Sequence, residues 1–289
     1  MSAAPVRVRV RAPAKVNLSL AVLGKRPDGF HEVDTRMLAL ELSDLLELAR
    51  APGPGVRLEL SGPHASADIP RDATNLAARA ARAALELSGS TEGLALRLEK
   101  HIPSGSGLGG GSSDAAAAWI GAATLVGLDP WSAAGESVLA ALGSDCVFFW
   151  KAAKTGYARC FGRGERVEPA PAPASPRCVA LVVPAVSCPT AAVYAAFRGR
   201  SSLVNELEEA ALAAVPELRA WRKALDSCGG TRWQLSGSGS AYFAAHDAAA
   251  EAHADLARVR TAFRSRKLVP RGSWVTGVPG RGAEILQVV

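Results

Sequence analysis

A glycine- and serine-rich segment, PSGSGLGGGSS, occupies Pro103–Ser113 and has the composition best suited to binding phosphate. Its glycines let the backbone approach a ligand closely, and an alanine-rich helix is predicted to follow from Asp114. The first turn of a helix offers unpaired N–H groups and the positive end of the helix dipole. The hydroxyls of Ser112 and Ser113 could donate to phosphate oxygens or bind the metal ion that accompanies ATP. The residues predicted to bind ATP are Pro103, Ser104, Gly105, Ser106, Gly107, Leu108, Gly109, Gly110, Gly111, Ser112 and Ser113.

A glycine-rich segment can also be a P-loop, a dinucleotide-binding loop or a turn without a ligand, and the first two have their own sequence patterns. No lysine follows the last glycine, as the P-loop pattern would require. Gly105, Gly107 and Gly110 do match the dinucleotide-binding pattern G-x-G-x-x-G, with Asp129 at about the distance of a ribose-binding acid. That acid should end a strand, however, and Asp129 follows the predicted helix. A nucleotide-binding oxidoreductase and a glycine-rich turn without a ligand remain as alternatives.

The elements that must position this segment are predicted from periodicity and punctuation. Alternating valine and arginine over Val6–Arg11 indicate a half-buried strand, and Pro13 is expected to separate it from a second strand over Val16–Val22. Further strands are predicted at Thr35–Leu40, Leu45–Leu48, Val56–Leu60, Leu94–Leu98, Cys178–Val183, Ala241–Ala245, Trp274–Thr276 and Glu284–Val288. Helices are predicted at Asn75–Leu87, Asp114–Val126, Ser132–Leu142, Thr190–Phe197, Leu203–Leu225 and Ala248–Arg264.

A proline- and alanine-rich stretch, Pro169–Pro176, is the best candidate for a boundary between domains. It divides the chain into an N-terminal lobe, residues 1–168, and a C-terminal lobe, residues 177–289. A second glycine- and serine-rich loop lies in the latter, at Ser236–Ser240. Strands and helices mix without a regular β-α-β alternation, so the predicted class is α+β.

Composition excludes several classes of protein. The 289 residues carry a net charge of +6 without a long basic run, and aromatic residues are 6% of the chain, so nucleic-acid binding is not expected. The longest apolar stretch, near Ala115–Leu128, is too short for a membrane span, and the first residues lack the apolar run of a secretory signal. A cytoplasmic location is therefore predicted. The five cysteines form no C-x-x-C pair and the histidines lack metal-ligand spacing, so neither disulfides nor a zinc site is expected.

Five stretches together carry a resemblance to a known family: PAKVNLSL (Pro13–Leu20), GKRPDGFHEV (Gly24–Val33), the glycine-rich segment, LGSDCVFFW (Leu142–Trp150) and LSGSGSAYF (Leu235–Phe243). The chain resembles the GHMP kinase superfamily. The first two stretches are most similar to the members that phosphorylate 4-diphosphocytidyl-2-C-methyl-D-erythritol. The resemblance implies a two-lobed fold, with an N-terminal lobe like ribosomal protein S5 domain 2 and a ferredoxin-like C-terminal lobe. It also implies transfer of phosphate from ATP, with Mg²⁺, to the 2-hydroxyl of that small molecule, in the non-mevalonate pathway to isoprenoid precursors.

Two catalytic residues are implied by the same resemblance. Asp145 would be the base that takes the hydroxyl proton, and Lys15 its cationic partner. A lysine beside an aspartate favours the ionised carboxylate and can stabilise the charge that develops on the attacking oxygen. The ligands of the metal ion and the oligomeric state are not predicted.

The acceptor-binding residues are likewise implied by resemblance. Phe30 and Tyr194 would lie on opposite faces of the cytosine ring, and His31 would hydrogen-bond to the base. Asn17 is expected to bond the methylerythritol part. Gly237 and Ser238 of the second glycine loop are also expected to bind substrate.

Alternative functions differ in what they require of the chain. A GHMP kinase for another small alcohol would not need the RPDGFH stretch (Arg26–His31). An oxidoreductase would bind NAD and would not depend on Lys15. A non-catalytic ATP-binding or RNA-binding relative would have no use for both Lys15 and Asp145. A kinase that acts on the cytidine-bearing alcohol is the prediction that uses all of these residues.

Overall fold

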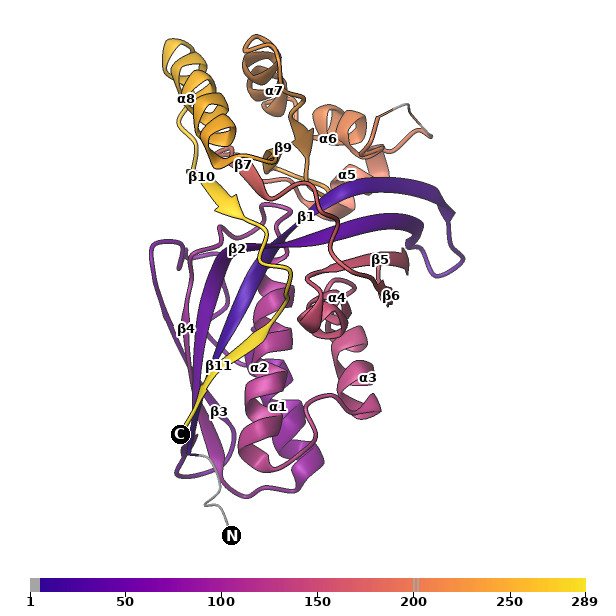
Figure 1. Cartoon of the computed structure of the whole chain (residues 1–289). Coiled ribbons are helices and arrows are strands. Elements are labelled where there is room, and N and C mark those ends of the chain that lie inside the picture. The colour runs from indigo at the N-terminus through magenta and orange to yellow at the C-terminus, as the bar shows by residue number, and fades with distance from the viewer. Residues whose placement is uncertain (1–5, 200, 202) are drawn as a thin grey trace.

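The computed structural model describes residues 6–199, 201 and 203–289, so the first five residues of the predicted N-terminal lobe lie outside the described residues. A seven-stranded sheet forms the first half of the molecule (Figure 1). The order is β11-β1-β2-β4-β3, and β5 pairs with both β2 and β6. All pairs are antiparallel except β3 with β4. The strands are β1 (Arg7–Lys25), β2 (His31–Ala51), β3 (Val56–Ser61), β4 (Gly93–Glu99), β5 (Tyr157–Gly162), β6 (Arg166–Pro169) and β11 (Glu284–Val288).

The strand β1 runs through Pro13, so the predicted break at that residue is wrong. The register between β1 and β2 shifts between Pro13 and Lys15, which marks a bulge. A bulge tolerates proline because the ladder bond that proline cannot donate is not required there. The same irregularity leaves the N–H of Lys15 free to donate to the carbonyl of Leu108, at 2.9 Å. A strand that was expected to end at Pro13 therefore continues and attaches to the glycine-rich segment.

Helices cover one face of this sheet (Figure 1). Helix α1 begins after Asn75, whose side chain accepts the N–H of Ala77 at 2.9 Å, as the predicted cap requires. Helix α2 begins at Gly110, four residues before the predicted start, and its alanines are buried. A side chain at Gly121 would lie 2.7 Å from Leu48, so small residues let α2 approach the sheet closely. The helices of this half are α1 (Leu76–Ser88), α2 (Gly110–Val126), α3 (Ala133–Leu142) and α4 (Cys146–Lys151), followed by a 3₁₀ turn at Ala152–Lys154.

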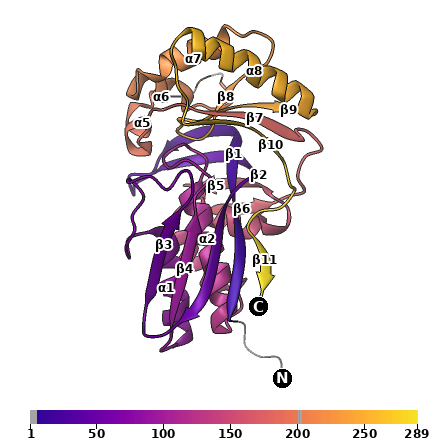
Figure 2. The same ribbon diagram turned by 90° about the vertical axis from the view of Figure 1, so that its left-hand side faces the viewer.

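A four-stranded antiparallel sheet in the order β10-β7-β9-β8 forms the second half. Figure 2 shows α7 and α8 on its outer side, with β1 and β2 beyond its inner side. The predicted helix Leu203–Leu225 is instead two helices, because Pro216 interrupts it. The elements are β7 (Cys178–Val183), α5 (Thr190–Ala196), α6 (Glu208–Ala214), α7 (Leu218–Asp226), β8 (Gln234–Leu235), β9 (Tyr242–His246), α8 (Ala249–Ser265) and β10 (Gly272–Gly277).

The two halves share a hydrophobic cluster where their sheets meet. Val16 and Leu38 of the first sheet pack in it with Leu181 and Phe243 of the second. Leu108 of the glycine-rich segment belongs to the same cluster, which places this segment between the lobes. The last strand, β11, returns across the predicted boundary and pairs with β1. No helix in the described part of the chain is long and apolar enough to cross a membrane.

Candidate active site

A cavity of about 930 Å³ opens between the two lobes, beside the glycine-rich segment. Its walls come from β1, β2, the segment itself, α5 and the second glycine loop. Every residue predicted for the site lines it except two, Leu108 and Ser113, which are fully buried. Phosphate-binding and acceptor-binding candidates from distant parts of the chain, from Asn17 to Ser238, therefore face one space.

Lys15 and Asp145 lie side by side in this cavity. Lys15 Nζ is 3.4 Å from Asp145 Oδ2 and donates to Asn17 Oδ1 at 2.6 Å. Asn17 Nδ2 donates in turn to Thr35 Oγ1, which donates to the carbonyl of Ser19. The Lys15 side chain is 4% exposed and that of Asp145 27% exposed. The ammonium group is thus held by buried neighbours, while the carboxylate remains open to a solute.

The glycine-rich segment is shaped by contacts that only glycine permits. Gly109, with φ +73°, precedes α2, and a side chain there would lie 3.0 Å from the Phe149 ring and 3.1 Å from Lys15 Cγ. Gly107, with φ +78°, packs so closely that a side chain would lie 2.2 Å from the carbonyl oxygen of Ser236. Both residues have the left-handed backbone that other residues adopt only at a cost. The first N–H groups of α2 have no acceptor within the helix. A phosphate group is the ligand best suited to accept these hydrogen bonds.

The second glycine loop holds the first in place. Ser236 Oγ donates to the carbonyl of Gly107 at 3.0 Å, and the N–H of Ala241 donates to the carbonyl of Ser106 at 2.8 Å. Asn205 Nδ2 donates to the carbonyl of Gly237 at 2.8 Å, so the second loop is itself anchored. A side chain at Gly237 would lie 3.4 Å from Lys15 Nζ, which puts this loop next to the Lys15–Asp145 pair.

The three aromatic side chains that were predicted to bind the cytosine, those of Phe30, His31 and Tyr194, lie at the other end of the cavity. Tyr194 stacks on His31, with ring centroids 4.9 Å apart and an interplanar angle of 24°. Phe30 is 51% exposed and lies under the guanidinium of Arg163. Burial, and then the charge of Lys25, lower the pKa of His31, while burial and the charge of Asp145 raise the pKa of Tyr194. Both rings are therefore neutral near pH 7 and can stack on or hydrogen-bond to an uncharged base.

Comparisons with known proteins show the family and the fold of the chain. The family model of the GHMP kinase N-terminal domain matches residues 75–147, which include the glycine-rich segment and Asp145. The 4-diphosphocytidyl-2-C-methyl-D-erythritol (CDP-ME) kinase of Gloeobacter violaceus is 36% identical over 264 residues, covering 82% of this chain and 84% of the relative. The chain belongs to the CDP-ME kinase family.

Other members and structures give the same picture. The CDP-ME kinase of Geobacillus thermodenitrificans is 36% identical over 268 residues, covering 82% of this chain and 88% of the relative. A crystal structure of a 4-(cytidine 5'-diphospho)-2C-methyl-D-erythritol kinase matches with a TM-score of 0.72 and 31% identity, over 93% of this chain and 99% of that one. A homoserine kinase from Cytophaga hutchinsonii also reaches a TM-score of 0.72, at 18% identity over 99% of each chain, and shows the fold alone. The prediction of a two-lobed GHMP kinase fold is confirmed.

In a chain of this family, the dinucleotide-binding alternative loses its support. Asp129 accepts the N–H of Trp131 in a turn and does not line the cavity, so the dinucleotide-like spacing has no ribose-binding acid. Next to Asp145, burial raises the pKa of the Cys146 thiol to about 12, so this thiol is not a nucleophile at neutral pH.

Sequence reasoning missed a buried ionic cluster behind the glycine-rich segment of this CDP-ME kinase family member. Lys100 Nζ donates to Asp114 Oδ2 at 2.5 Å and also to Asp44. Asp44 Oδ1 accepts the N–H of Ile102 at 2.8 Å. Asp114, predicted to begin the helix, lies inside α2 and faces Lys100. No local pattern indicates the cluster, because its members come from β2, the end of β4 and α2.

Further residues of the cavity wall also escaped prediction. They lie on β1 and β2, in α1, α2 and α5, and in the connections β1–β2, β3–α1, β4–α2, α3–α4 and β5–β6. Those not predicted for the site are Leu20, Lys25, Gly29, Val33, Thr35, Met37, Asp68, Ile69, Pro70, Thr74, Asn75, Leu76, Lys100, Ile102, Asp114, Ser144, Arg163, Thr190, Ala191 and Ala195. Their types are unremarkable in sequence, and only the fold brings them to the cavity.

Proposed function

We propose that this protein transfers the γ-phosphoryl group of ATP to the 2-hydroxyl of CDP-ME. The observation that carries the proposal is the single cavity that joins the glycine-rich segment, the Lys15–Asp145 pair and the aromatic residues Phe30, His31 and Tyr194. Membership in the CDP-ME kinase family supports the same substrate. The five cysteines are free, consistent with a reducing compartment, and we place the reaction in the cytoplasm.

The reaction requires an in-line displacement and a destination for one proton. The oxygen of the 2-hydroxyl attacks the γ-phosphorus, and the bond between that phosphorus and the β,γ-bridging oxygen breaks. The electron pair of the broken bond leaves with ADP. The hydroxyl proton passes to the carboxylate of Asp145, which is the more exposed member of its pair with Lys15.

Lys15 acts on the charge that develops during transfer. Its ammonium group is fixed by Asn17 and Asp145, so it needs no rearrangement as the attacking oxygen gains negative charge. The start of α2 offers N–H groups and the positive end of its dipole to the phosphates of ATP. The narrow packing of Gly107 and Gly109 holds these donors in position.

Mg²⁺ would neutralise part of the charge of the phosphates. The Ser112 hydroxyl lines the cavity and is an oxygen donor available for it. The neighbouring Ser113 Oγ has no hydrogen-bond partner among the described residues, but it is fully buried and does not line the cavity.

An ADP-release assay with ATP and Mg²⁺ tests this function. CDP-ME, mevalonate and homoserine would be offered separately as acceptors. ADP release that depends on CDP-ME alone is expected. Turnover with mevalonate or homoserine only would contradict the substrate while leaving the reaction class intact. No ADP from any acceptor would favour a non-catalytic ATP-binding relative.

A further inference from the structure

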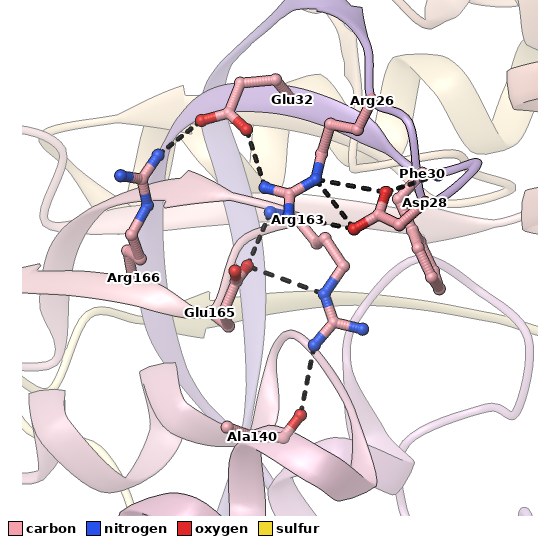
Figure 3. A network of polar contacts seen from close by, with 8 residues as sticks. All are labelled: Arg26, Asp28, Phe30, Glu32, Ala140, Arg163, Glu165 and Arg166. Atoms are coloured by element: carbon pink, nitrogen blue, oxygen red, sulfur yellow. Dashed lines mark hydrogen bonds and ion pairs between the residues drawn. The ribbon is translucent and has the colours of Figure 1, made fainter.

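The turn between β5 and β6 carries the guanidinium of Arg163, which Figure 3 shows together with its polar neighbours. Arg163, in this turn, lines the same cavity as Lys15 and Asp145. Its guanidinium carbon lies 4.9 Å from the centroid of the Phe30 ring, stacked over that ring. Arg163 takes no part in the phosphoryl-transfer steps proposed for Lys15 and Asp145.

The three arginines around this turn differ in how firmly carboxylates hold them. Arg26 donates to Asp28 and Glu32 at 2.9 Å, and Arg166 donates to Glu32 at 2.5 Å (Figure 3). Arg163 has only a long contact to Glu165, at 3.9 Å from Nε, and a weak donation to the carbonyl of Ala140, at 3.4 Å. Its positive charge is therefore the least neutralised of the three.

The carboxylate of Glu165 mainly holds the backbone of the turn and neutralises little of the positive charge on the Arg163 side chain. Its carboxylate accepts the N–H of Arg163 at 2.6 Å, and a side chain at Gly162 would lie 2.7 Å from the same carboxylate. These contacts with Glu165 therefore hold the turn in one defined conformation. Arg163 leaves it toward Phe30, with its side chain 29% exposed.

The same turn also touches the catalytic end of the cavity. A side chain at Gly164 would lie 3.6 Å from Asp145 Oδ1 and 3.6 Å from Ser144. The residue next to it, Arg163, stacks on Phe30. The turn thus bridges the space between the base-binding aromatic and the proton-accepting carboxylate.

We propose that Arg163 binds the diphosphate of the acceptor. This inference rests on the proposed function, since that acceptor carries its diphosphate between a cytosine and the reacting alcohol. With the cytosine against Phe30 and the hydroxyl at Asp145, the diphosphate must cross the turn that carries Arg163. A guanidinium is planar and has paired donors that match phosphate oxygens. Arg163 would then select for an acceptor that carries a diphosphate.

Two other cations around the cavity are already paired. Lys15 is held by Asn17 and Asp145, and Lys100 by two aspartates. Lys25 also lines the cavity, close enough to His31 to lower the pKa of that ring. Lys25 is therefore the competing source of positive charge, and the test separates the two residues.

The experiment compares the affinities of cytidine and cytidine diphosphate by calorimetry. A non-hydrolysable ATP analogue is kept at saturation, so that the glycine-rich segment is occupied. Wild type is expected to bind the diphosphate at least ~10-fold more tightly than cytidine, which equals about 1.4 kcal/mol. Arg163→Gln should remove most of this preference and leave the affinity for cytidine unchanged. Arg163→Lys should keep part of it, because the charge remains and the planar fork is lost.

Arg166→Gln is the matched control. It removes an arginine at the start of β6, next to the turn, that is already paired with Glu32 and does not line the cavity. It should bind both ligands as wild type does. In steady-state assays with CDP-ME, Arg163→Gln should raise the acceptor KM and leave the KM for ATP unchanged.

Distinct results would overturn the inference. If Arg163→Gln kept the preference for the diphosphate and Lys25→Gln lost it, Lys25 would be the ligand and the inference wrong. If Arg163→Gln weakened cytidine and cytidine diphosphate equally, Arg163 would act only by packing on Phe30. Absence of CDP-ME turnover and of cytidine binding in wild type would remove the proposed function, and the inference with it.

Discussion

Asp145 lies where a proton acceptor is needed, with a partly exposed carboxylate beside a buried ammonium group. Asp145→Asn keeps the size of the side chain and removes its basicity. We expect turnover to fall by roughly 10²–10⁴-fold, the contribution of general base catalysis, while ATP binding measured by calorimetry stays close to wild type. Wild-type turnover in the variant would refute the assignment of Asp145 as base.

Asp129→Asn is the matched control for Asp145→Asn. Asp129 is exposed, lies outside the cavity and would matter only to the dinucleotide-binding alternative. Its substitution should leave kcat and both KM values unchanged. Loss of activity in Asp129→Asn would show that the glycine spacing has a meaning other than the one proposed.

Tyr194 tests the acceptor end at the same scale. Its ring stacks on His31, and burial leaves it uncharged at neutral pH. If the ring also supports the cytosine, Tyr194→Ala should raise the acceptor KM by roughly 10-fold or more, because stacking of a base on an aromatic ring contributes ~1–3 kcal/mol. Tyr194→Phe keeps the ring and should retain nearly all of the affinity. Steady-state kinetics at fixed ATP would measure both, and equal losses in the two variants would assign the effect to the hydroxyl.

At the scale of elements, the Lys100 cluster ties β2, β4 and α2 together behind the glycine-rich segment. Burial, partly offset by Lys100, raises the pKa of Asp114 to about 8. The folded protein therefore holds a proton that the unfolded chain loses above about pH 4. Because the folded state binds more protons between these pKa values, the free energy of unfolding must fall as pH rises through this window.

Asp114→Asn isolates this contribution. The amide side chain cannot ionise. The free energy of unfolding of the variant should therefore fall less than that of wild type between pH 5 and pH 8, by roughly 1–3 kcal/mol. Urea unfolding at several pH values would measure the difference. Asp129→Asn, which changes an exposed carboxylate, should follow the wild-type curve. Parallel curves for wild type and Asp114→Asn would mean that Asp114 is ionised and paired with Lys100 throughout.

At the scale of the whole molecule, the two glycine loops join the lobes. Gly107 and the carbonyl of Ser236 leave no space for a side chain, and Ser236 Oγ donates back to Gly107. Gly107→Ala must therefore separate the loops as well as strain the backbone. We expect a loss of roughly 2–4 kcal/mol in the free energy of unfolding and a weaker affinity for ATP.

Gly127→Ala separates these two effects. Gly127 ends α2 with φ +77°, close to the +78° of Gly107, but no atom lies within 4 Å of the position its side chain would take. Its substitution should cost about 1–2 kcal/mol from the backbone alone, and ATP affinity should not change. Thermal unfolding and calorimetry on both variants measure the difference. Equal effects on ATP affinity would argue against contact between the loops as the cause.

Much of the architecture follows from local patterns. The Asn75 cap, the alanine-rich helix and the alternating strands are set by propensities that act over a few residues. The predicted end of β1 at Pro13 failed because a bulge, which depends on the partner strand, accommodates the proline. The single helix predicted over 203–225 is wrong because Pro216 has no N–H to donate and separates α6 from α7.

The glycine-rich segment and the motif residues are the part of the site that the sequence by itself determined, because their chemistry lies in residue types and short spacings. The tertiary structure alone brought Lys15 within 3.4 Å of Asp145 and paired Tyr194 with His31. It also placed Arg163 over Phe30 and buried Lys100 between two aspartates. Such contacts join segments that are far apart in the chain, and they depend on strand register and lobe packing, which no local pattern encodes.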